Sequence, residues 1–173
     1  MKHPLESFVY CPRCGSHNFN VDGERSRRCS DCGLTYYANA SASTAAIITN
    51  SKGEVLLTTR AFDPAKGRLD LPGGFVDMNE TAEEALIREL KEELDIDVKE
   101  MEYLFSLPNE YDFSGVIVHT LDLFFRVVVD DYVEIKACDD VALAQFYDLK
   151  DVNIDDIGLD SIKKAILKIK NDN

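Results

Sequence analysis

The chain has 173 residues, of which 45% are hydrophobic and 29% charged, and its formal net charge is −13. This composition is that of a globular protein and excludes a disordered or fibrous chain. No apolar run approaches the roughly 20 residues that span a bilayer, so we expect no membrane segment. The N-terminus has no apolar export signal, and the five cysteines therefore predict a reducing, cytoplasmic location.

The charge is unevenly distributed. Residues 1–40 hold five basic and four acidic residues, whereas the other 133 residues hold 14 basic and 28 acidic ones, a net charge of −14. An acidic body repels a phosphate backbone, so we expect no nucleic-acid partner for it. If such a body handles phosphates, it needs a divalent cation between its carboxylates and the substrate.

Two cysteine pairs mark the N-terminal segment. Each pair has the form C-x2-C, the pairs are fourteen residues apart, and a glycine follows each; the four cysteines are Cys11, Cys14, Cys29 and Cys32. Four thiolates complete a closed tetrahedral zinc shell with no position left for catalysis. Disulfides or a redox C-x-x-C are the alternatives, but doubled pairs at this spacing favour structural Zn²⁺. The segment resembles a zinc ribbon, which we place at residues 1–40.

The basic residues between the cysteine pairs are open to two interpretations. Arg25, Arg27 and Arg28 could contact nucleic acid, but a solvated hairpin face is the simpler interpretation. Cys138 is the remaining cysteine, and we expect a buried free thiol there.

Residues 41–173 predict one mixed domain. Residues 38–46 are small and indicate a linker running into a strand, and residues 69–76 indicate an extended segment with a sharp turn at Pro72-Gly73-Gly74. We predict strands over 45–49, 54–60, 101–107, 117–129 and 142–147. A closing helix is predicted over 161–170. Strands combined with two helices indicate an α/β (α+β) domain.

The other predicted helix covers residues 81–94. Leu86, Leu90 and Leu94 form an apolar stripe, and Thr81 with Glu84 has the spacing of a capping box. Three glutamates at i, i+3 and i+4 share one face beside that stripe, namely Glu89, Glu92 and Glu93. Hard oxygen ligands suit Mg²⁺ or Mn²⁺. Taken alone, the glutamates indicate a solvated acidic helix, but a glycine loop precedes them.

The loop and the helix together resemble a known motif. Gly74, five residues, Glu80, seven residues and then Arg88-Glu-Leu-Lys-Glu-Glu93 resemble the box of the Nudix hydrolases. The likeness extends upstream through Arg60 and residues 70–74, and so to most of residues 41–150. It implies a Nudix fold, with a mixed β-sheet between helices, and Mg²⁺-dependent hydrolysis of a nucleoside diphosphate linked to another moiety.

The resemblance also implies functional roles. Glu89, Glu92, Glu93 and the main-chain carbonyl of Gly73 would hold the metal ions, with Glu89 as an alternative base for the attacking water. Two positions depart from the family pattern, because Asn79 and Asp95 stand where glycine is usual. Both residue types tolerate a left-handed backbone, so we expect both turns to survive.

Further roles follow from the same resemblance. Arg88 would fix Glu80 or Glu89 through its planar fork. A later loop supplies another acid in many members of the family. Asp140 is our candidate for that acid, with Glu110 and Asp139 as alternatives and ordinary surface acids as the simpler explanation.

The substrate is less defined. A zinc ribbon before a Nudix domain resembles the NADH pyrophosphatases, which also act on NAD-capped RNA. Their Ser-Gln-Pro-Trp-Pro-Phe-Pro-x-Ser signature is missing from residues 106–114, and the chain has no tryptophan. NADH specificity is therefore not expected. The resemblance to Nudix enzymes of this size, among which that preference is the commonest, implies ADP-ribose or a similar nucleotide sugar as substrate, with Arg60 as a substrate-binding residue. The rings of Phe62, Tyr111 and Phe113 lie in predicted loops and could stack on a base, although core packing explains them equally well.

Three alternatives stay open. An NADH or NAD-capped RNA pyrophosphatase is the first. A non-catalytic ADP-ribose sensor is the second, although the box glutamates are intact and no helix-turn-helix segment is present. An RNA-end processing enzyme whose ribbon grips the transcript is the third. The sequence does not decide between a monomer and a homodimer.

Overall fold

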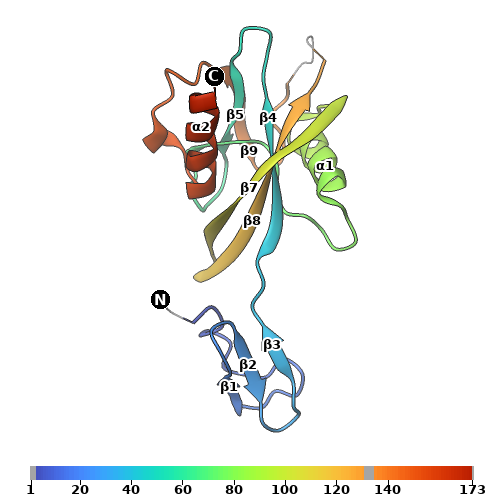
Figure 1. The fold of residues 1–173 in the computed structure, drawn as a ribbon, viewed down its shortest axis with the longest axis vertical. Helices are drawn as coiled ribbons and strands as arrows, with labels where there is room; N and C mark the ends of the chain where they lie inside the picture. The colour runs from blue at the N-terminus through green and yellow to red at the C-terminus, as the bar shows by residue number, and fades with distance from the viewer. Residues whose placement is uncertain (1–2, 131–134, 173) are drawn as a thin grey trace.

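The structure is a computed structural model of the chain and describes residues 3–130 and 135–172 (Figure 1). A small three-stranded unit comes first, and a larger unit with two α-helices follows. The strands are β1 (Phe19–Val21), β2 (Ser26–Cys29), β3 (Thr35–Tyr37), β4 (Ser41–Ile48), β5 (Val55–Arg60), β6 (Leu69–Asp70), β7 (Glu100–Phe113), β8 (Val116–Val128) and β9 (Val141–Tyr147). The helices are α1 (Ala82–Leu94), the short 3-10 helix η1 (Ile154–Asp156) and α2 (Asp160–Asp172).

The N-terminal unit is an antiparallel sheet of β1, β2 and β3. Its core is very small: Cys11, Phe19 and Cys29 are each at most 2% exposed and pack together. A core of this size stabilises a fold weakly, and units this small depend on a metal or on disulfides. Two of the three buried residues in this cluster are cysteines, so metal binding and packing coincide.

The expected linker is shorter than predicted. Strand β4 begins at Ser41 and pairs in parallel with β8 from Ser41–Thr120 to Ile48–Val127. The small residues have a packing reason, because successive residues of β4 belong to two different cores. Ala45 packs in the core under α2 and Ala46 in the core under α1. A strand buried on both faces between close neighbours accommodates small side chains, and a composition of this kind can be mistaken for a linker.

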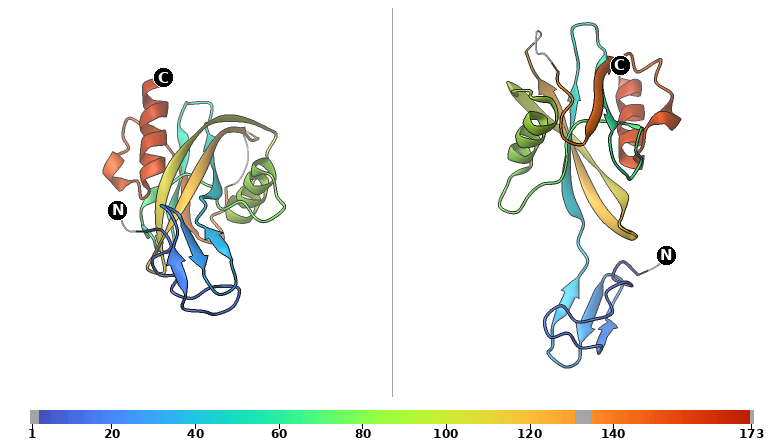
Figure 2. Two further views of the ribbon diagram at one scale, coloured as in Figure 1. Left: turned by 60° about the horizontal axis from the view of Figure 1, so that its bottom comes forward. Right: turned by 180° about the vertical axis from the view of Figure 1, so that it is seen from behind.

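Two three-stranded sheets form the larger unit. Their strand orders are β4-β8-β7 and β6-β5-β9, and the β4–β8 pair is parallel while the others are antiparallel. Helix α1 lies on one side of the sheets and α2 on the other, as the views of Figures 1 and 2 agree. The predicted mixed sheet between helices is confirmed, with the difference that the strands form two sheets.

Each helix covers its own apolar core. Leu86, Leu90 and Leu94 of α1 are fully buried, as are Ala165 and Ile166 of α2. Burial of one such leucine contributes about 1.5–3 kcal/mol. The predicted leucine stripe therefore anchors α1, and neither helix of the described chain has the length and hydropathy to cross a membrane.

The ends of α1 match the sequence expectations. The Thr81 hydroxyl accepts a hydrogen bond from the backbone N–H of Glu84 at 3.1 Å, and the Glu84 carboxylate accepts one from the N–H of Thr81 at 2.8 Å. This is the predicted capping box. Asn79 and Asp95 have φ values of 70° and 55°, so both adopt the left-handed backbone expected of them.

The β7–β8 hairpin is longer than predicted. Tyr111 and Phe113, expected in loops, lie in β7, opposite Val118 and Val116 of β8. The prediction failed because polar residues interrupt the apolar pattern of this strand. Backbone pairing continues to the turn at Ser114 regardless of which side chains are polar.

Cys138 is exposed, which corrects the expectation of a buried thiol. Its backbone N–H donates a hydrogen bond of 2.8 Å to the carbonyl of Glu93, near the end of α1. The segment is thus attached to the helix by its main chain, and the thiol does not contribute to the core.

Candidate active site

The glycine loop is held between β4 and α1. The N–H of Thr44 donates to the Gly74 carbonyl at 2.8 Å, and the N–H of Val76 donates to the Ala42 carbonyl at 3.0 Å. Gly73 has φ of 137°, and a β-carbon there would lie 2.2 Å from the Thr44 carbonyl oxygen. Only glycine fits this position without moving the strand.

Gly73 connects the loop to the helix. Its backbone N–H donates a hydrogen bond of 2.9 Å to Oε2 of Glu93. The resemblance implied that the Gly73 carbonyl is a metal ligand, and the bond from the N–H of the same residue places Gly73 beside the Glu93 carboxylate. Gly74 lies under Glu89, whose carboxylate carbon would be 2.5 Å from an added β-carbon.

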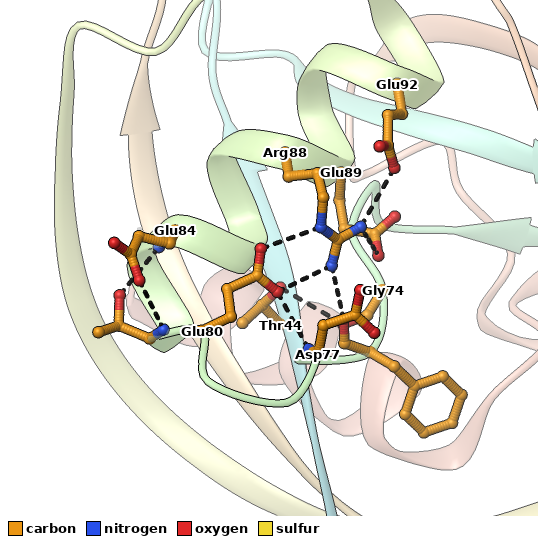
Figure 3. Close-up of polar contacts among 10 residues, drawn as sticks. Thr44, Gly74, Asp77, Glu80, Glu84, Arg88, Glu89 and Glu92 are labelled. Carbon is orange, nitrogen blue, oxygen red and sulfur yellow. Dashed lines mark hydrogen bonds and ion pairs between the residues drawn. The ribbon is translucent and has the colours of Figure 1, made fainter.

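Arg88 joins the acidic residues into one network (Figure 3). Its guanidinium donates to both carboxylate oxygens of Glu80 at 2.9 and 3.0 Å. It also donates to Glu89 at 2.8 Å and to Glu92 at 3.1 Å. The fifth N–H donates to the Phe75 carbonyl at 3.0 Å, so all five donors are engaged. The sequence expectation named Glu80 or Glu89 as the partner, and the fork reaches both.

The three box glutamates differ in burial. Glu92 is half exposed, with 51% of its side chain accessible, Glu89 is 17% accessible, and Glu93 is buried. Glu93 follows Leu86 by seven residues and Leu90 by three, so its side chain continues the apolar stripe. The prediction that all three glutamates lie beside the apolar stripe is therefore wrong for Glu93, which lies within the stripe.

Burial and like charges perturb these carboxyls. Burial, together with the nearby charges of Asp140, Glu89 and Asp70, raises the pKa of Glu93 to about 9, although the hydrogen bond from Gly73 opposes this. Burial also raises the pKa of Glu89, although Arg88 opposes this. Carboxyl groups that are held close together with little solvation repel one another when ionised, so protonation or a bound cation stabilises them.

The donor set fits a hard divalent cation. Glu89 and Glu93 offer carboxylate oxygens in a site with excess negative charge, and such oxygens suit Mg²⁺ or Mn²⁺. The carboxylates have not converged, since Arg88 holds Glu89 and Glu92 while Gly73 holds Glu93. Within residues 3–130 and 135–172, the four cysteines are the only group of three or more His, Cys, Asp or Glu residues whose ligand atoms all lie within 4.8 Å of one another.

Asp140 lies near this network. It lines the same pocket as Gly73 and Gly74, and its charge acts on both Glu89 and Glu93. Its backbone carbonyl accepts a hydrogen bond from Ala61 at 2.8 Å, which fixes the loop.

The two alternatives for the later acid lie elsewhere. Glu110 is 4.0 Å from Nδ1 of His119 and does not line this pocket. Asp139 precedes the candidate, has φ of 50°, and is also outside the lining. Of the three candidates, Asp140 alone shares the pocket with the box.

A pocket of about 110 Å³ continues from the glycine loop toward α2. Arg60 and Tyr111, both predicted to contact substrate, line it. Arg60 donates to Asp70 at 2.7 Å and to the Tyr111 hydroxyl at 3.0 Å. Burial would lower the pKa of Arg60, but Asp70 and Tyr111 outweigh it and raise that pKa. The guanidinium is thus a fixed cation at the pocket wall.

The other two predicted rings do not line the pocket. Phe62 is 61% exposed and Phe113 is 55% exposed. Phe75, which the sequence reasoning passed over, lies edge-on to Tyr111 with ring centroids 5.8 Å apart. Phe75 follows the box glycine directly, and that position is the signal that could have identified it.

Four polar residues that line the pocket were also missed. Ser43, Asn109, Thr120 and Asp122 line it, and they come from β4, β7 and β8. Asp122 interrupts an apolar run of β8 and is only 5% exposed. A charged residue within an apolar strand could have identified Asp122 from the sequence. The residues that surround it could not be identified in this way, because strand pairing brings them together.

The cysteine cluster has the geometry of a closed structural zinc site. The sulfurs of Cys11 and Cys32 are 3.6 Å apart, and those of Cys14 and Cys29 are 3.7 Å apart. A tetrahedral shell with Zn–S bonds of about 2.3 Å separates its sulfurs by roughly 3.8 Å, so the spacing fits zinc. All five cysteines are free thiols, which argues against the disulfide alternative.

Known proteins share both units. Residues 40–167 match the NUDIX domain family, and residues 6–37 match the NADH pyrophosphatase zinc ribbon domain. An ADP-ribose pyrophosphatase of Methanocaldococcus jannaschii is 38% identical over 107 residues, which are 61% of this chain and 60% of that protein. An NAD-capped RNA hydrolase NudC of Pseudomonas fluorescens is 36% identical over 97 residues, 56% of this chain and 34% of that protein.

Solved structures share the fold. A NUDIX hydrolase of Nitrosomonas europaea superposes with a TM-score of 0.65 at 21% identity, covering 92% of this chain and 88% of that one. The NUDIX domain of Shewanella oneidensis NrtR, solved with ADP ribose, gives a TM-score of 0.62 at 19% identity, covering 79% and 90%. The chain spans 34% to 60% of the first three curated relatives. The family match covers most of the chain and includes the glycine loop, Arg88 and the box glutamates, so the chain belongs to the Nudix family.

Proposed function

We propose that the protein hydrolyses the diphosphate bond of a nucleoside diphosphate linked to another moiety, with Mg²⁺ or Mn²⁺ as the cation and ADP-ribose as its preferred substrate. The observation that carries this proposal is the packing of the glycine loop against Glu89 and Glu93 beside a polar pocket. Carboxyls with raised pKa values in a cleft are typical of catalytic and metal-binding sites.

The residues of the chain have distinct tasks in this proposal. Glu89, Glu92, Glu93 and the Gly73 carbonyl would hold the cation. When bound, such a cation neutralises diphosphate oxygens and lowers the pKa of a bound water. Arg88 is a positioning residue, because its fork keeps Glu89 and Glu92 beside the loop.

The chemical step needs a proton acceptor near the attacking water. Glu89 and Asp140 are the candidates, since Asp140 lines the pocket and its charge acts on Glu89. Water attacks one phosphorus, its proton passes to a carboxylate oxygen, and the bond from that phosphorus to the bridging oxygen breaks. ADP-ribose then yields AMP and ribose 5-phosphate.

The choice of ADP-ribose has two supports. The Methanocaldococcus jannaschii relative, described as an ADP-ribose pyrophosphatase, is 38% identical in the aligned region. The NADH signature is missing after the box, and specificity is a difference in transition-state binding. An NADH or NAD-capped RNA pyrophosphatase is the second candidate, favoured by the ribbon match and by the NudC relatives.

A competition assay separates these candidates. Equal concentrations of ADP-ribose and NADH are incubated with the protein and Mg²⁺, and the products are resolved by chromatography. We expect AMP and ribose 5-phosphate to appear first. Earlier appearance of nicotinamide mononucleotide would reverse the ordering, and faster cleavage of a short NAD-capped RNA would assign the protein to the second candidate.

Two further expectations belong to the same proposal. The substrate is a small molecule, and the acidic body should not retain short RNA in a filter-binding assay at physiological salt. The oligomeric state is open between a monomer and a homodimer, which light scattering after size exclusion would decide.

A further inference from the structure

A second pocket, of about 590 Å³, lies in the larger unit away from the glycine loop. It is formed between the β4–β5 hairpin and the C-terminal half of α2, at the end of this unit that is farthest from the N-terminal unit (Figures 1 and 2). None of the described residues lines both this pocket and the one at the glycine loop. Ligand pockets commonly have volumes of about 300–1,000 Å³, so a molecule of nucleotide size can enter this one.

Basic side chains gather in this pocket. Five of its lining residues are basic and one, Asp148, is acidic; the basic residues are Lys52, Arg126, Lys150, Lys168 and Lys170. Residues 41–173 contain 14 basic and 28 acidic residues, so more than a third of their basic residues line one pocket. We call it the lysine pocket. Its charge is opposite to that of the surrounding unit and predicts an anionic ligand.

The lysines of this pocket have no acidic partner within the described part of the chain. The ion pairs that lysines form there belong to Lys91, Lys99 and Lys136. The ammonium group of Lys168 lies 5.2 Å from the ring centroid of Phe105, which itself lines the pocket. The ammonium group of Lys170 donates to the Val152 carbonyl at 3.1 Å, which is a neutral acceptor. Cations that gather without counter-charges repel one another, and a bound anion removes this repulsion.

The remaining lining is mostly apolar. It consists of Thr49, Gly53 and six apolar side chains, which are Ile47, Val55, Leu104, Phe105, Leu149 and Ile169. Ile47, Val55 and Leu149 are each at most 7% exposed and belong to the core under α2, so packing fixes this part of the pocket. A ligand that has an uncharged part as well as negative charges matches this combination of side chains.

The surrounding charge limits the size of the ligand. At physiological ionic strength charges act over about 8 Å, so a small anion inside the pocket interacts mainly with the lysines. A polymer that extends beyond the pocket meets a unit with twice as many acidic as basic residues. Arg126 already pairs with Glu102 at 2.7 Å, so the four lysines supply the charge that an anion can neutralise. Several lysines favour several phosphate charges over a single carboxylate.

We propose that the lysine pocket binds a small organic polyphosphate, whose phosphate groups contact the lysines and whose uncharged part covers the apolar side chains. This site is separate from the proposed hydrolysis, because no residue of the glycine loop or of α1 lines it. It also differs in its need for metal. At the glycine loop a divalent cation must lie between carboxylates and phosphate, whereas lysines bind phosphate directly.

Calorimetric titration of ATP into the protein with a chelator present tests this proposal. Without a divalent cation the acidic site at the glycine loop repels ATP, so binding reports on the lysine pocket. We expect ATP to bind at least about tenfold more tightly than inorganic tripolyphosphate, because apolar surface is buried as well. Equal affinities, or no binding of ATP, would overturn the proposal. So would a short single-stranded RNA that binds as tightly as ATP.

Lys168→Glu should weaken the binding of ATP at least about tenfold, because it reverses one charge inside the pocket. Lys164→Glu is the matched control, with the same change in net charge. Lys164 is exposed, lies one turn earlier in α2 and lines a different pocket together with Asp160 and Glu110. Its substitution should change the affinity by no more than about twofold, since salt screens charges outside the pocket. Equal effects of the two variants would refute the site, and thermal unfolding checks that both are folded.

Chemical-shift mapping of backbone amides locates the bound ATP in the same metal-free protein. Gly53 and Leu149 line the lysine pocket, whereas Gly73 and Gly74 line the pocket at the glycine loop. We expect the amide signals of the first two residues to shift and those of the two loop glycines to stay in place. Shifts confined to the loop glycines would place ATP in the other pocket and overturn the proposal.

These measurements also keep the inference separate from the proposed hydrolysis. Binding of ATP in chelator that Lys168→Glu weakens supports the lysine pocket even if no nucleotide sugar is hydrolysed. Hydrolysis of ADP-ribose by a protein that does not bind ATP in chelator refutes the inference and leaves the proposed function standing.

Discussion

The carboxylate of Glu89 covers Gly74 so closely that a β-carbon on the glycine would lie 2.5 Å from Cδ and Oε1 of Glu89. The neighbouring glycine has a different constraint, because a β-carbon on Gly73 would meet the backbone of Thr44 at 2.2 Å. A flexible side chain can move away from such a contact, whereas a paired strand cannot. Gly74 is thus required by the contact with the site residue Glu89, and Gly73 is required by the close approach of the folded backbone.

Gly74→Ala should therefore impair activity more than stability. The added methyl group displaces the Glu89 carboxylate, and we expect kcat/KM for ADP-ribose to fall at least tenfold, about 1.4 kcal/mol in the barrier. Gly73→Ala should instead destabilise the fold by roughly 1–3 kcal/mol or more, as overpacking does. Chemical denaturation and initial rates measure both effects. A Gly74→Ala protein with full activity would contradict the contact with Glu89.

Glu93→Gln should abolish Mg²⁺-dependent hydrolysis and leave the fold intact. The amide oxygen can still accept the hydrogen bond from Gly73, so the loop keeps its attachment to α1. The negative charge, which would hold the cation, is lost. Residual hydrolysis above about a tenth of the unmodified rate, a barrier change under ~1.4 kcal/mol, would count against this role of Glu93.

The raised pKa of Glu93 predicts that the stability of the metal-free protein depends on pH, and Glu93→Gln tests this. The folded-state pKa of Glu93 is raised to about 9, so the folded protein holds a proton that the unfolded chain has released above about pH 4.5. Stability should therefore fall as the pH rises between these two values. Glu93→Gln removes this loss, and its melting temperature in chelator should exceed that of the unmodified protein more at pH 8 than at pH 5. A difference that is constant with pH would contradict the burial of this charge.

The local features of the site were predictable because they depend on neighbours in the sequence. The leucine spacing of α1, the capping box of Thr81 and Glu84 and the left-handed cap at Asp95 are set within a few residues. The cysteine pairs are local in the same sense. The burial of Glu93 was not predicted, although the sequence pattern indicates it, since the spacing of Glu93 from Leu86 places it in the buried stripe.

The pocket could not be derived from the sequence, because pairing between distant strands creates it. Ser43 and Asp122 are separated by 79 residues and meet through the parallel pairing of β4 and β8. Asn109 reaches the same wall through the register of the β7–β8 hairpin. A shift of one residue in either pairing would turn these side chains to the opposite face.

The N-terminal unit should contain about one zinc ion per chain without added metal. The four thiols of the cluster are placed for a tetrahedral shell, and the small core around Phe19 depends on two of them. Elemental analysis of protein purified without chelators measures the content. Cys138→Ser is the control and should leave it unchanged, while Cys29→Ser should lower it; protein without zinc would refute the site.

Removal of that zinc should unfold residues 8–37 alone, because metal binding and folding are linked locally in so small a unit. Trypsin reports this, since Arg25, Arg27 and Arg28 lie in the unit. After chelation we expect rapid cleavage at these arginines, with a protected fragment that retains the two helices. Simultaneous degradation of the larger unit would show that its stability also depends on the zinc.

Arg88→Lys should reduce activity although it preserves the positive charge. The guanidinium uses all five donors, on Glu80, Glu89, Glu92 and a backbone carbonyl, and an ammonium group cannot match that planar geometry. We expect kcat to fall at least tenfold, about 1.4 kcal/mol.

Because the fork holds Glu89 and Glu92 in position, the loss caused by Arg88→Lys should be accompanied by a higher Mg²⁺ concentration for half-maximal activity. A purely structural role would leave this concentration unchanged in the molecules that remain folded. Arg126→Lys is the matched control, since Arg126 forms an exposed ion pair with Glu102 at 2.7 Å, and such pairs contribute about 0–1 kcal/mol. Equal rates and equal Mg²⁺ dependence for the two lysine variants would mean that charge alone suffices at position 88, and that the fork does not position the glutamates.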